Sequence, residues 1–166
     1  MSSPPAFGID LGTTNSAIAY TDRNQVHMVP MSEQETSIPS LFTLDEKGKP
    51  VIGEEARTQK NPAALISASK RLIGRNFHRA EELQQLFTYD IIDGGEQNAL
   101  IPILDQVFTM EEISAAIITQ LCNVAKSHTG YDVKEAVLTV PTYFDEQQRS
   151  AIKKAGELAG IRVLRI

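Results

Sequence analysis

The sequence of 166 residues has little cysteine, no tryptophan and no long apolar run. Its single cysteine, Cys122, excludes an internal disulfide framework and a cysteine-based zinc site. The three histidines, His27, His78 and His128, lie far apart and show no metal-ligand spacing. No apolar stretch approaches the roughly 20 residues that span a bilayer. The first residues lack a basic region followed by a long apolar core, so we expect no secretory signal.

The chain also has no excess of positive charge. Lys+Arg 16 against Asp+Glu 21 gives a formal net charge of −5. This balance disfavours nucleic-acid and anionic-membrane partners, which bind basic faces. A composition with 42% hydrophobic and 22% charged residues is typical of a folded globular domain. We therefore expect one cytoplasmic domain that binds neither nucleic acid nor a membrane.

The first 30 residues predict three short strands joined by tight turns. Apolar residues recur at 6–12, at 17–20 and at 26–29, and Pro30 ends the third run. Because the connections are short, we expect the three strands to form an antiparallel meander.

Residues 31–108 differ in composition and indicate an inserted small α+β subdomain. They are rich in proline, glycine, glutamate and glutamine. Two strand-like pieces at 40–44 and 50–53 flank a turn and predict a hairpin. Apolar residues at 64–73 follow a helical spacing, which predicts a helix that carries Lys70.

The last third carries clear helix signals. Thr109 and Glu112 have the spacing of a capping box, which predicts the start of a helix that ends at Gly130. Asp145 and Gln148 have the same spacing, and they predict the start of a second helix.

Two strands alternate with these helices, at 135–140 and 161–166. The first is continuously apolar enough to predict a buried parallel strand. The order of elements is that of a ribonuclease-H-like α/β fold, with three antiparallel strands followed by parallel strands joined by helices. We expect residues 1–30 and 109–166 to form this unit, with 31–108 inserted.

The richest chemical motif follows the first strand. Asp10 ends an apolar run, and Gly12, Thr13, Thr14 and Asn15 follow it. A glycine lets the backbone approach a bulky anion, and the N–H groups and hydroxyls after it can donate to phosphate oxygens. A carboxylate beside phosphate needs a cation between them, and Mg²⁺ fits because it keeps its waters. A tight turn in which backbone N–H groups satisfy Asp10 explains the pattern equally well.

The segment Ile-Asp-Leu-Gly-Thr-Thr-Asn-Ser at 9–16 resembles the opening signature of the heat-shock protein 70 chaperones. Ser-Lys-Arg-Leu-Ile-Gly-Arg at 69–75 is similar to the lysine-bearing segment of that family's inserted subdomain. Residues 137–149, which include Val-Pro-Thr-Tyr-Phe, resemble the family's second-strand-to-helix motif, and 155–166 resemble the stretch leading into its first interlobe connection. The resemblance is collinear from about residue 6 to the end.

The resemblance implies an actin/hexokinase-type ATPase lobe that uses ATP or ADP with Mg²⁺. By this resemblance, Asp10 would hold the metal through water. Gly12, Thr13, Thr14 and Asn15 would contact the phosphates. Lys70 would reach the γ-phosphate and the attacking water, which suits a reaction that depends on positioning and charge. The alternative for Lys70 is a solvated helix lysine.

The resemblance also makes Pro141 a switch residue and Arg149 its relay to a substrate-binding domain. A strand-terminating proline and a surface arginine are the alternatives. Thr142 stands where the family most often has alanine. Family partners would be J-domain co-chaperones and nucleotide exchange factors, with unfolded client peptides bound through a domain outside these residues.

We expect a single lobe of this kind to be weak or inactive alone, because the second phosphate loop and the adenosine pocket are outside these 166 residues. A non-catalytic interaction module derived from the lobe is one rival function. A small-molecule kinase or actin-like relative is another, although the segments at 69–75 and 137–149 argue against it. Cys122 is expected to be a small buried apolar residue.

Overall fold

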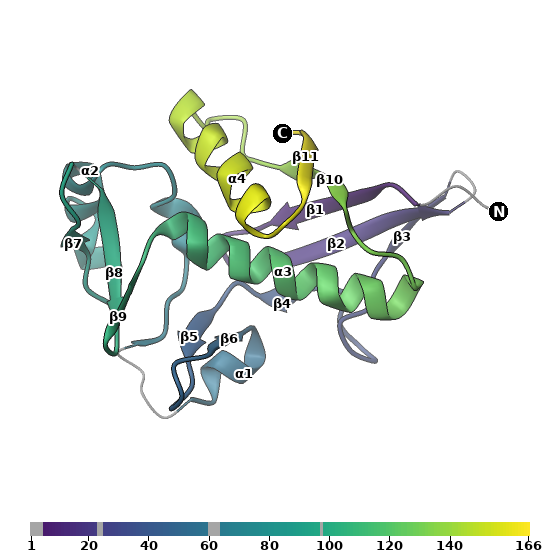
Figure 1. Ribbon diagram of the computed structural model, residues 1–166, viewed down its shortest axis with the longest axis horizontal. Helices are drawn as coiled ribbons and strands as arrows, with labels where there is room; N and C mark the ends of the chain where they lie inside the picture. Colours follow the sequence, from purple (N-terminus) through teal and green to yellow (C-terminus); the bar gives the residue numbers. More distant parts are fainter. Residues whose placement is uncertain (1–4, 23–24, 60–63, 97) are drawn as a thin grey trace.

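The computed structural model describes residues 5–22, 25–59, 64–96 and 98–166, a mixed α/β molecule with one large and two small sheets (Figure 1). The large sheet has the strand order β11-β10-β1-β2-β3, and β4 also pairs with β2. Its strands are β1 (Phe7–Leu11), β2 (Asn15–Asp22), β3 (Gln25–Met28), β4 (Ile38–Pro39), β10 (Glu135–Thr139) and β11 (Arg162–Arg165).

The pairing within the large sheet confirms the predicted meander and the parallel strands after it. β1, β2 and β3 pair antiparallel in sequence order. β10 lies parallel to β1, and β11 lies parallel to β10. β2 extends beyond the predicted 17–20 at both ends.

The prediction of a continuously buried strand at 135–140 is wrong. In β10, Ala136 and Leu138 are buried, whereas Glu135, Val137 and Thr139 are exposed. In β10, the buried residues point to the face of the sheet that α3 and α4 cover (Figure 1). The exposed residues point to the opposite face, which the described residues cover less. Side chains alternate along a strand, so one covered face gives an alternating burial pattern.

Two small sheets and short helices make up the middle of the chain. The predicted hairpin is confirmed as β5 (Phe42–Leu44) and β6 (Pro50–Ile52). Sequence analysis did not predict the three-stranded sheet or the short helices. These elements are α1 (Glu54–Arg57), η2 (Ser69–Arg71), α2 (Phe77–Glu81), η3 (Gln84–Leu86), β7 (Ile92–Asp93), β8 (Ala99–Ile103) and β9 (Gln106–Phe108).

The predicted helix over 64–73 is wrong. Ser69–Arg71 form the 3-10 turn η2, and Ile66 exchanges two backbone hydrogen bonds with Phe42, at 2.8 and 3.0 Å. Ala68 adopts a left-handed conformation, with φ 52°, which interrupts any helix at that point. The helical spacing arose because a strand-like bridge and a turn both place apolar residues in the core.

Both long helices begin where their capping boxes predicted. The Thr109 hydroxyl accepts from the Glu112 N–H at the start of α3 (Met110–Thr129), and Gly130 ends this helix with φ 77°. The Asp145 carboxylate accepts from the Gln148 N–H at the start of α4 (Glu146–Leu158). Reciprocal capping satisfies N–H groups that have no partner inside a helix.

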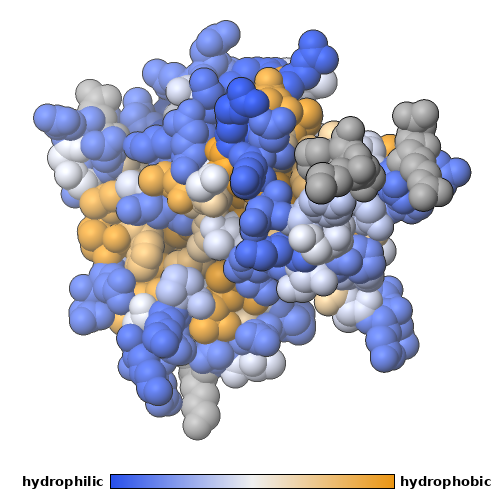
Figure 2. Space-filling view, turned by 45° about the vertical axis from the view of Figure 1, so that its right-hand side comes forward, coloured by the Kyte–Doolittle hydropathy of each residue, from blue (hydrophilic) through white to orange (hydrophobic). Residues whose placement is uncertain are grey.

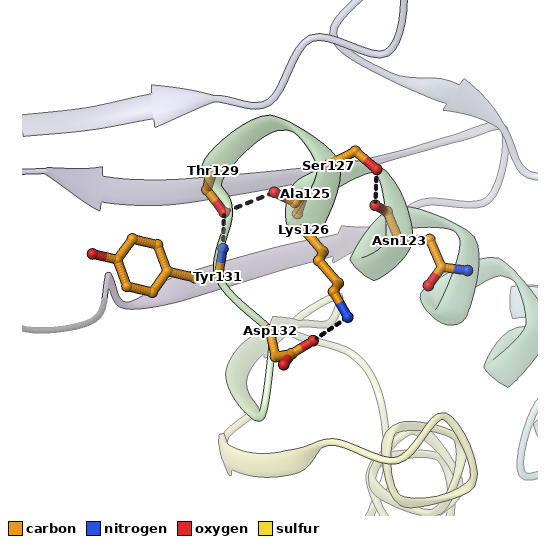
Figure 3. Close-up of polar contacts among 7 residues, drawn as sticks. All are labelled: Asn123, Ala125, Lys126, Ser127, Thr129, Tyr131 and Asp132. Carbon is orange, nitrogen blue, oxygen red and sulfur yellow. Dashed lines mark hydrogen bonds and ion pairs between the residues drawn. The ribbon is translucent and has the colours of Figure 1, made fainter.

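The end of α3 turns the chain towards β10 through side-chain contacts (Figure 3). The Thr129 hydroxyl donates to the Ala125 carbonyl at 2.7 Å and accepts from the Tyr131 N–H at 3.2 Å. Lys126 and Asp132 form an ion pair at 2.8 Å, which raises the pKa of Lys126 and lowers that of Asp132. Both side chains are exposed, so the pair orients the turn more than it stabilises the fold.

α3 supplies the centre of one continuous core. Its buried face includes Ile113, Ile117, Ile118 and Leu121, all fully inaccessible. The helix contacts strands of all three sheets, and in Figure 1 it crosses the large sheet with the small sheets near its N-terminal half. Figure 2 shows a surface on which apolar patches lie between hydrophilic groups. Within the described part of the chain, no helix is both long enough and apolar enough to span a bilayer.

Replacing Ser114 by alanine should leave the free energy of unfolding unchanged or raise it by about 1 kcal/mol. Ser114 on α3 is fully buried, and its hydroxyl has no hydrogen-bond partner among the described residues. The variant therefore loses no bond and removes a desolvated polar group. Urea denaturation followed by circular dichroism measures the change. A loss above about 1 kcal/mol would contradict the prediction.

Candidate functional site

Asp10 and Thr139 lie side by side at the ends of two adjacent parallel strands. Asp10 is an exposed residue near the end of β1, and it pairs with Thr139 on β10. The Thr139 hydroxyl donates to Asp10 Oδ1 at 2.7 Å. Among the described residues no backbone N–H donates to this carboxylate, so the interpretation of Asp10 as satisfied by its own turn is wrong. Sequence analysis missed Thr139, which could have been found from the pairing of the first strand with 135–140.

The turn after β1 approaches its own backbone at Gly12. A Cβ atom at this position would lie 1.9 Å from the Asn15 carbonyl oxygen. Real Cβ contacts are never that short, so the turn requires glycine here. The structure thereby explains the glycine of the motif independently of any ligand.

The turn presents free hydrogen-bond donors. Within the described residues, the backbone N–H groups of Thr13 and Thr14 have no hydrogen-bond partner. Thr14 is exposed and Thr13 is half-buried. Consecutive free N–H groups in a turn form a concave site that suits an anion.

Lys70 is a buried lysine on the turn η2, and only 6% of its surface is exposed. Its Nζ lies 5.7 Å from the centroid of the Phe144 ring, within the range of a cation–π contact. Burial lowers the pKa of Lys70 below its ordinary value, and the negative charge of Asp10 opposes this change. The alternative of a solvated helix lysine is therefore wrong. A buried ammonium group is costly unless it has a partner, so its burial points to a ligand.

A cavity of about 250 Å³ brings Thr13 and Lys70 together. Its lining consists of Thr13, Lys70, Arg71, Arg75, Leu83, Leu86, Tyr143, Phe144 and Gln148. This set of described residues contains three cations and no carboxylate. The cavity therefore favours an anionic ligand.

Close packing at Gly74 holds the Lys70 segment against α4. A Cβ atom on Gly74 would lie 2.6 Å from the Gln148 Cα, and Gly74 has φ 70°. The segment therefore packs backbone against backbone with the first turn of α4. Phe144 lies just before α4, so this packing places Lys70 over its ring.

Pro141 and Arg149 both contact the backbone of Phe144. The Phe144 N–H donates to the Pro141 carbonyl at 3.1 Å, and Arg149 Nε donates to the Phe144 carbonyl at 3.1 Å. Arg149 is half-buried. A relay role for both residues stays a prediction. Sequence analysis missed Phe144, whose place between them depends on the folded loop.

Cys122 lies on α3 and is half-buried. Burial raises the pKa of its thiol to about 11. The thiol therefore stays protonated at neutral pH and behaves as a small, weakly polar group.

Comparison with known protein families matches residues 6–166 to the family described as "Hsp70 protein". The chain belongs to the Hsp70 family. It is 40% identical over 164 residues to the "Chaperone protein DnaK" of Buchnera aphidicola subsp. Schizaphis graminum. The aligned region covers 96% of this chain and 26% of that protein, so the chain spans about a quarter of the length of this curated relative.

The resemblance to the Hsp70 chaperones is thus confirmed. The chain corresponds to an N-terminal fragment of the family, and family membership implies an actin-like ATPase fold. Hsp70 ATPases bind ATP or ADP with Mg²⁺. A kinase or actin-like protein outside the Hsp70 family is no longer a rival.

Replacing Gly74 by alanine should lower the free energy of unfolding by at least about 2 kcal/mol. The new methyl group meets the α4 backbone, and the left-handed conformation adds a backbone cost. Gly160→Ala is the control, because Gly160 has φ 80° with nothing within 4 Å of a new Cβ. Chemical denaturation of both variants separates the two effects. Equal losses would show that no close contact exists at Gly74.

Replacing Lys70 by methionine should leave the stability unchanged or raise it, because a buried ammonium group is removed. The lowered pKa means that the folded state binds this proton less tightly than the unfolded state. Stability therefore rises as pH increases from the folded pKa towards 10.5, and the variant should lose this rise. Urea denaturation at several alkaline pH values measures it, with the exposed Lys153→Met as control. A loss above about 1 kcal/mol at neutral pH would contradict the prediction.

Proposed function

We propose that this chain forms the phosphate-binding lobe of an ATP-hydrolysing Hsp70 chaperone that assists protein folding. One observation carries the proposal: Thr13 and Lys70 line the same cavity, whose described lining holds three cationic side chains and no carboxylate. The Thr13 N–H group has no hydrogen-bond partner among the described residues, and the Lys70 side chain is buried. Such a site binds the terminal phosphates of a nucleotide. Burying Lys70 costs stability, which favours a functional role for this lysine.

The proposed mechanism follows from the nature of phosphoryl transfer, which depends on positioning and on charge stabilisation. The backbone N–H groups of Thr13 and Thr14 bind and orient the phosphate oxygens, and Asn15 adds a polar side chain. Gly12 allows the tight turn that carries these N–H groups, because a Cβ atom there would meet the Asn15 carbonyl oxygen. The Lys70 ammonium group stabilises the negative charge that develops on the transferred phosphoryl group.

Asp10 suits Mg²⁺ held through water. It is a single, exposed carboxylate at the rim of the turn, and Mg²⁺ binds few carboxylates and keeps its waters. Thr139 holds the Asp10 carboxylate in place through its hydroxyl. The metal would neutralise phosphate charge beside the carboxylate.

We propose that residues 1–30 and 109–166 form a ribonuclease-H-like unit and that 31–108 are an inserted small α+β subdomain. The large sheet with α3 and α4 supports the first part, and the two small sheets support the second. β4 joins them, because it belongs to the inserted segment and pairs with β2.

We also propose that Pro141 and Arg149 relay the nucleotide state through Phe144, whose backbone both contact and whose ring lies under Lys70. By family membership, the partners would be J-domain co-chaperones, nucleotide exchange factors and, through a separate domain, unfolded peptides. A cytoplasmic location is part of this proposal.

Titration of the ¹⁵N-labelled chain with Mg-ATP, followed by NMR, tests the proposed site. We expect the amide signals of Thr13 and Thr14 to shift, with an affinity in the millimolar range because one lobe supplies half of a cleft. Lys70→Met should weaken binding, whereas Lys153→Met should not. Shifts confined to other parts of the chain, or no shift at Thr13 and Thr14, would overturn the proposal.

A further inference from the structure

Two buried serines adjoin the turn of Gly12, Thr13 and Thr14, here called the phosphate turn, but they do not line the cavity beside it. Ser16, on β2, is 1% exposed, and Ser40, which follows β4, is 3% exposed. Their hydroxyl oxygens lie 2.8 Å apart. They are far apart in sequence, and no motif marked Ser40. Neither serine has a part in the function proposed above, so their purpose needs a separate account.

The direction of each hydrogen bond follows from counting protons. Ser40 Oγ lies 2.8 Å from the Gly12 carbonyl oxygen, which can only accept, so Ser40 donates its single hydroxyl proton there. Ser16 must therefore donate to Ser40. Ser16 Oγ in turn accepts from the Gly12 N–H at 3.2 Å. The three hydrogen bonds therefore form a closed ring. The Gly12 N–H donates to Ser16, Ser16 donates to Ser40, and Ser40 donates to the Gly12 carbonyl.

This ring fixes the orientation of the peptide unit that follows Gly12. In a trans peptide the C=O and the next N–H point in opposite directions, and the described residues contain no cis peptide. The Gly12 carbonyl points to Ser40, so the Thr13 N–H points away from it. The Ser40 N–H also donates to the Thr14 carbonyl at 2.7 Å. The Asn15 N–H therefore points away from Ser40 as well.

We propose that Ser16 and Ser40 are positioning residues that hold the phosphate turn with its carbonyls turned inward and its N–H groups turned towards the ligand. A carbonyl oxygen facing a phosphate would repel it, so an anion site built from peptide groups needs its carbonyls directed elsewhere. Ser40 donates hydrogen bonds to two of these carbonyls, those of Gly12 and Thr14, so both point towards the β4 side of the turn. The ring of hydrogen bonds belongs to the fold and does not depend on any ligand. Its effect on phosphate binding rests on the proposed function.

Hydrogen exchange of the unaltered chain gives the first test, and it needs no ligand. The Gly12 amide should exchange at least about tenfold more slowly than those of Thr13 and Thr14, because it alone donates within the ring. Equal exchange at the three amides would overturn the ring.

Serine-to-alanine variants give the second test, with magnesium pyrophosphate as the probe. Ser16→Ala and Ser40→Ala should each raise the dissociation constant about tenfold, and the double variant should lose no more than either single variant. This non-additivity is expected because each change opens the same ring. The matched control is Ser114→Ala, which removes a buried hydroxyl without a hydrogen-bond partner among the described residues. It should leave the dissociation constant unchanged.

The outcomes separate the two proposals. Unchanged pyrophosphate affinity in both single variants, or additive losses in the double variant, would overturn the positioning role. If the unaltered chain bound no pyrophosphate, the proposed function would fail, while the exchange pattern would still decide whether the ring exists. If one alanine variant failed to fold, the other variant and the exchange experiment would still test the ring.

Discussion

The burial of α3 is the constraint on which the rest of the structure depends. Strands of the large sheet and of both small sheets contact this one helix, so each sheet completes its core against it. The turn that carries Lys70 also contacts α3. The phosphate turn lies at the end of β1, and the lysine comes from the middle of the chain. A distance between elements so far apart in sequence can be fixed only if both pack on a common support, and α3 supplies it.

The burial of Lys70 makes the candidate site locally destabilising. A chain under selection for stability alone would not bury Lys70 over an aromatic ring near two arginines, because the Lys70 ammonium group loses its water and the neighbouring positive charges repel it. The fold offsets this cost elsewhere, through two capping boxes and an extensive apolar core. Local conflicts of this kind are expected at functional sites.

Short sequence patterns predicted the parts of the fold that depend on residues close together in the chain. Both capping boxes lie where Thr109 and Asp145 indicated, because capping involves residues three positions apart. The predicted helix over 64–73 does not form because Ile66 bonds to Phe42, which is distant in the sequence, and Ala68 adopts a left-handed conformation. The positions of Asp10, Gly12 and Thr13 could be predicted from one contiguous motif. Thr139 follows only once the pairing of the first strand with 135–140 is known. The contacts of Phe144 with Lys70 and of Ser40 with Gly12 could not be predicted, because they join segments that the sequence does not place side by side.

The lone cysteine gives the molecule an internal reporter. Cys122 sits half-buried on α3, and burial holds the pKa of its thiol near 11, so little reactive thiolate exists in the folded chain at neutral pH. A thiol reagent would therefore label it slowly while α3 stays packed. Because the chain contains one sulfhydryl group, any rise in the labelling rate reports a change in the surroundings of α3, with no substitution required.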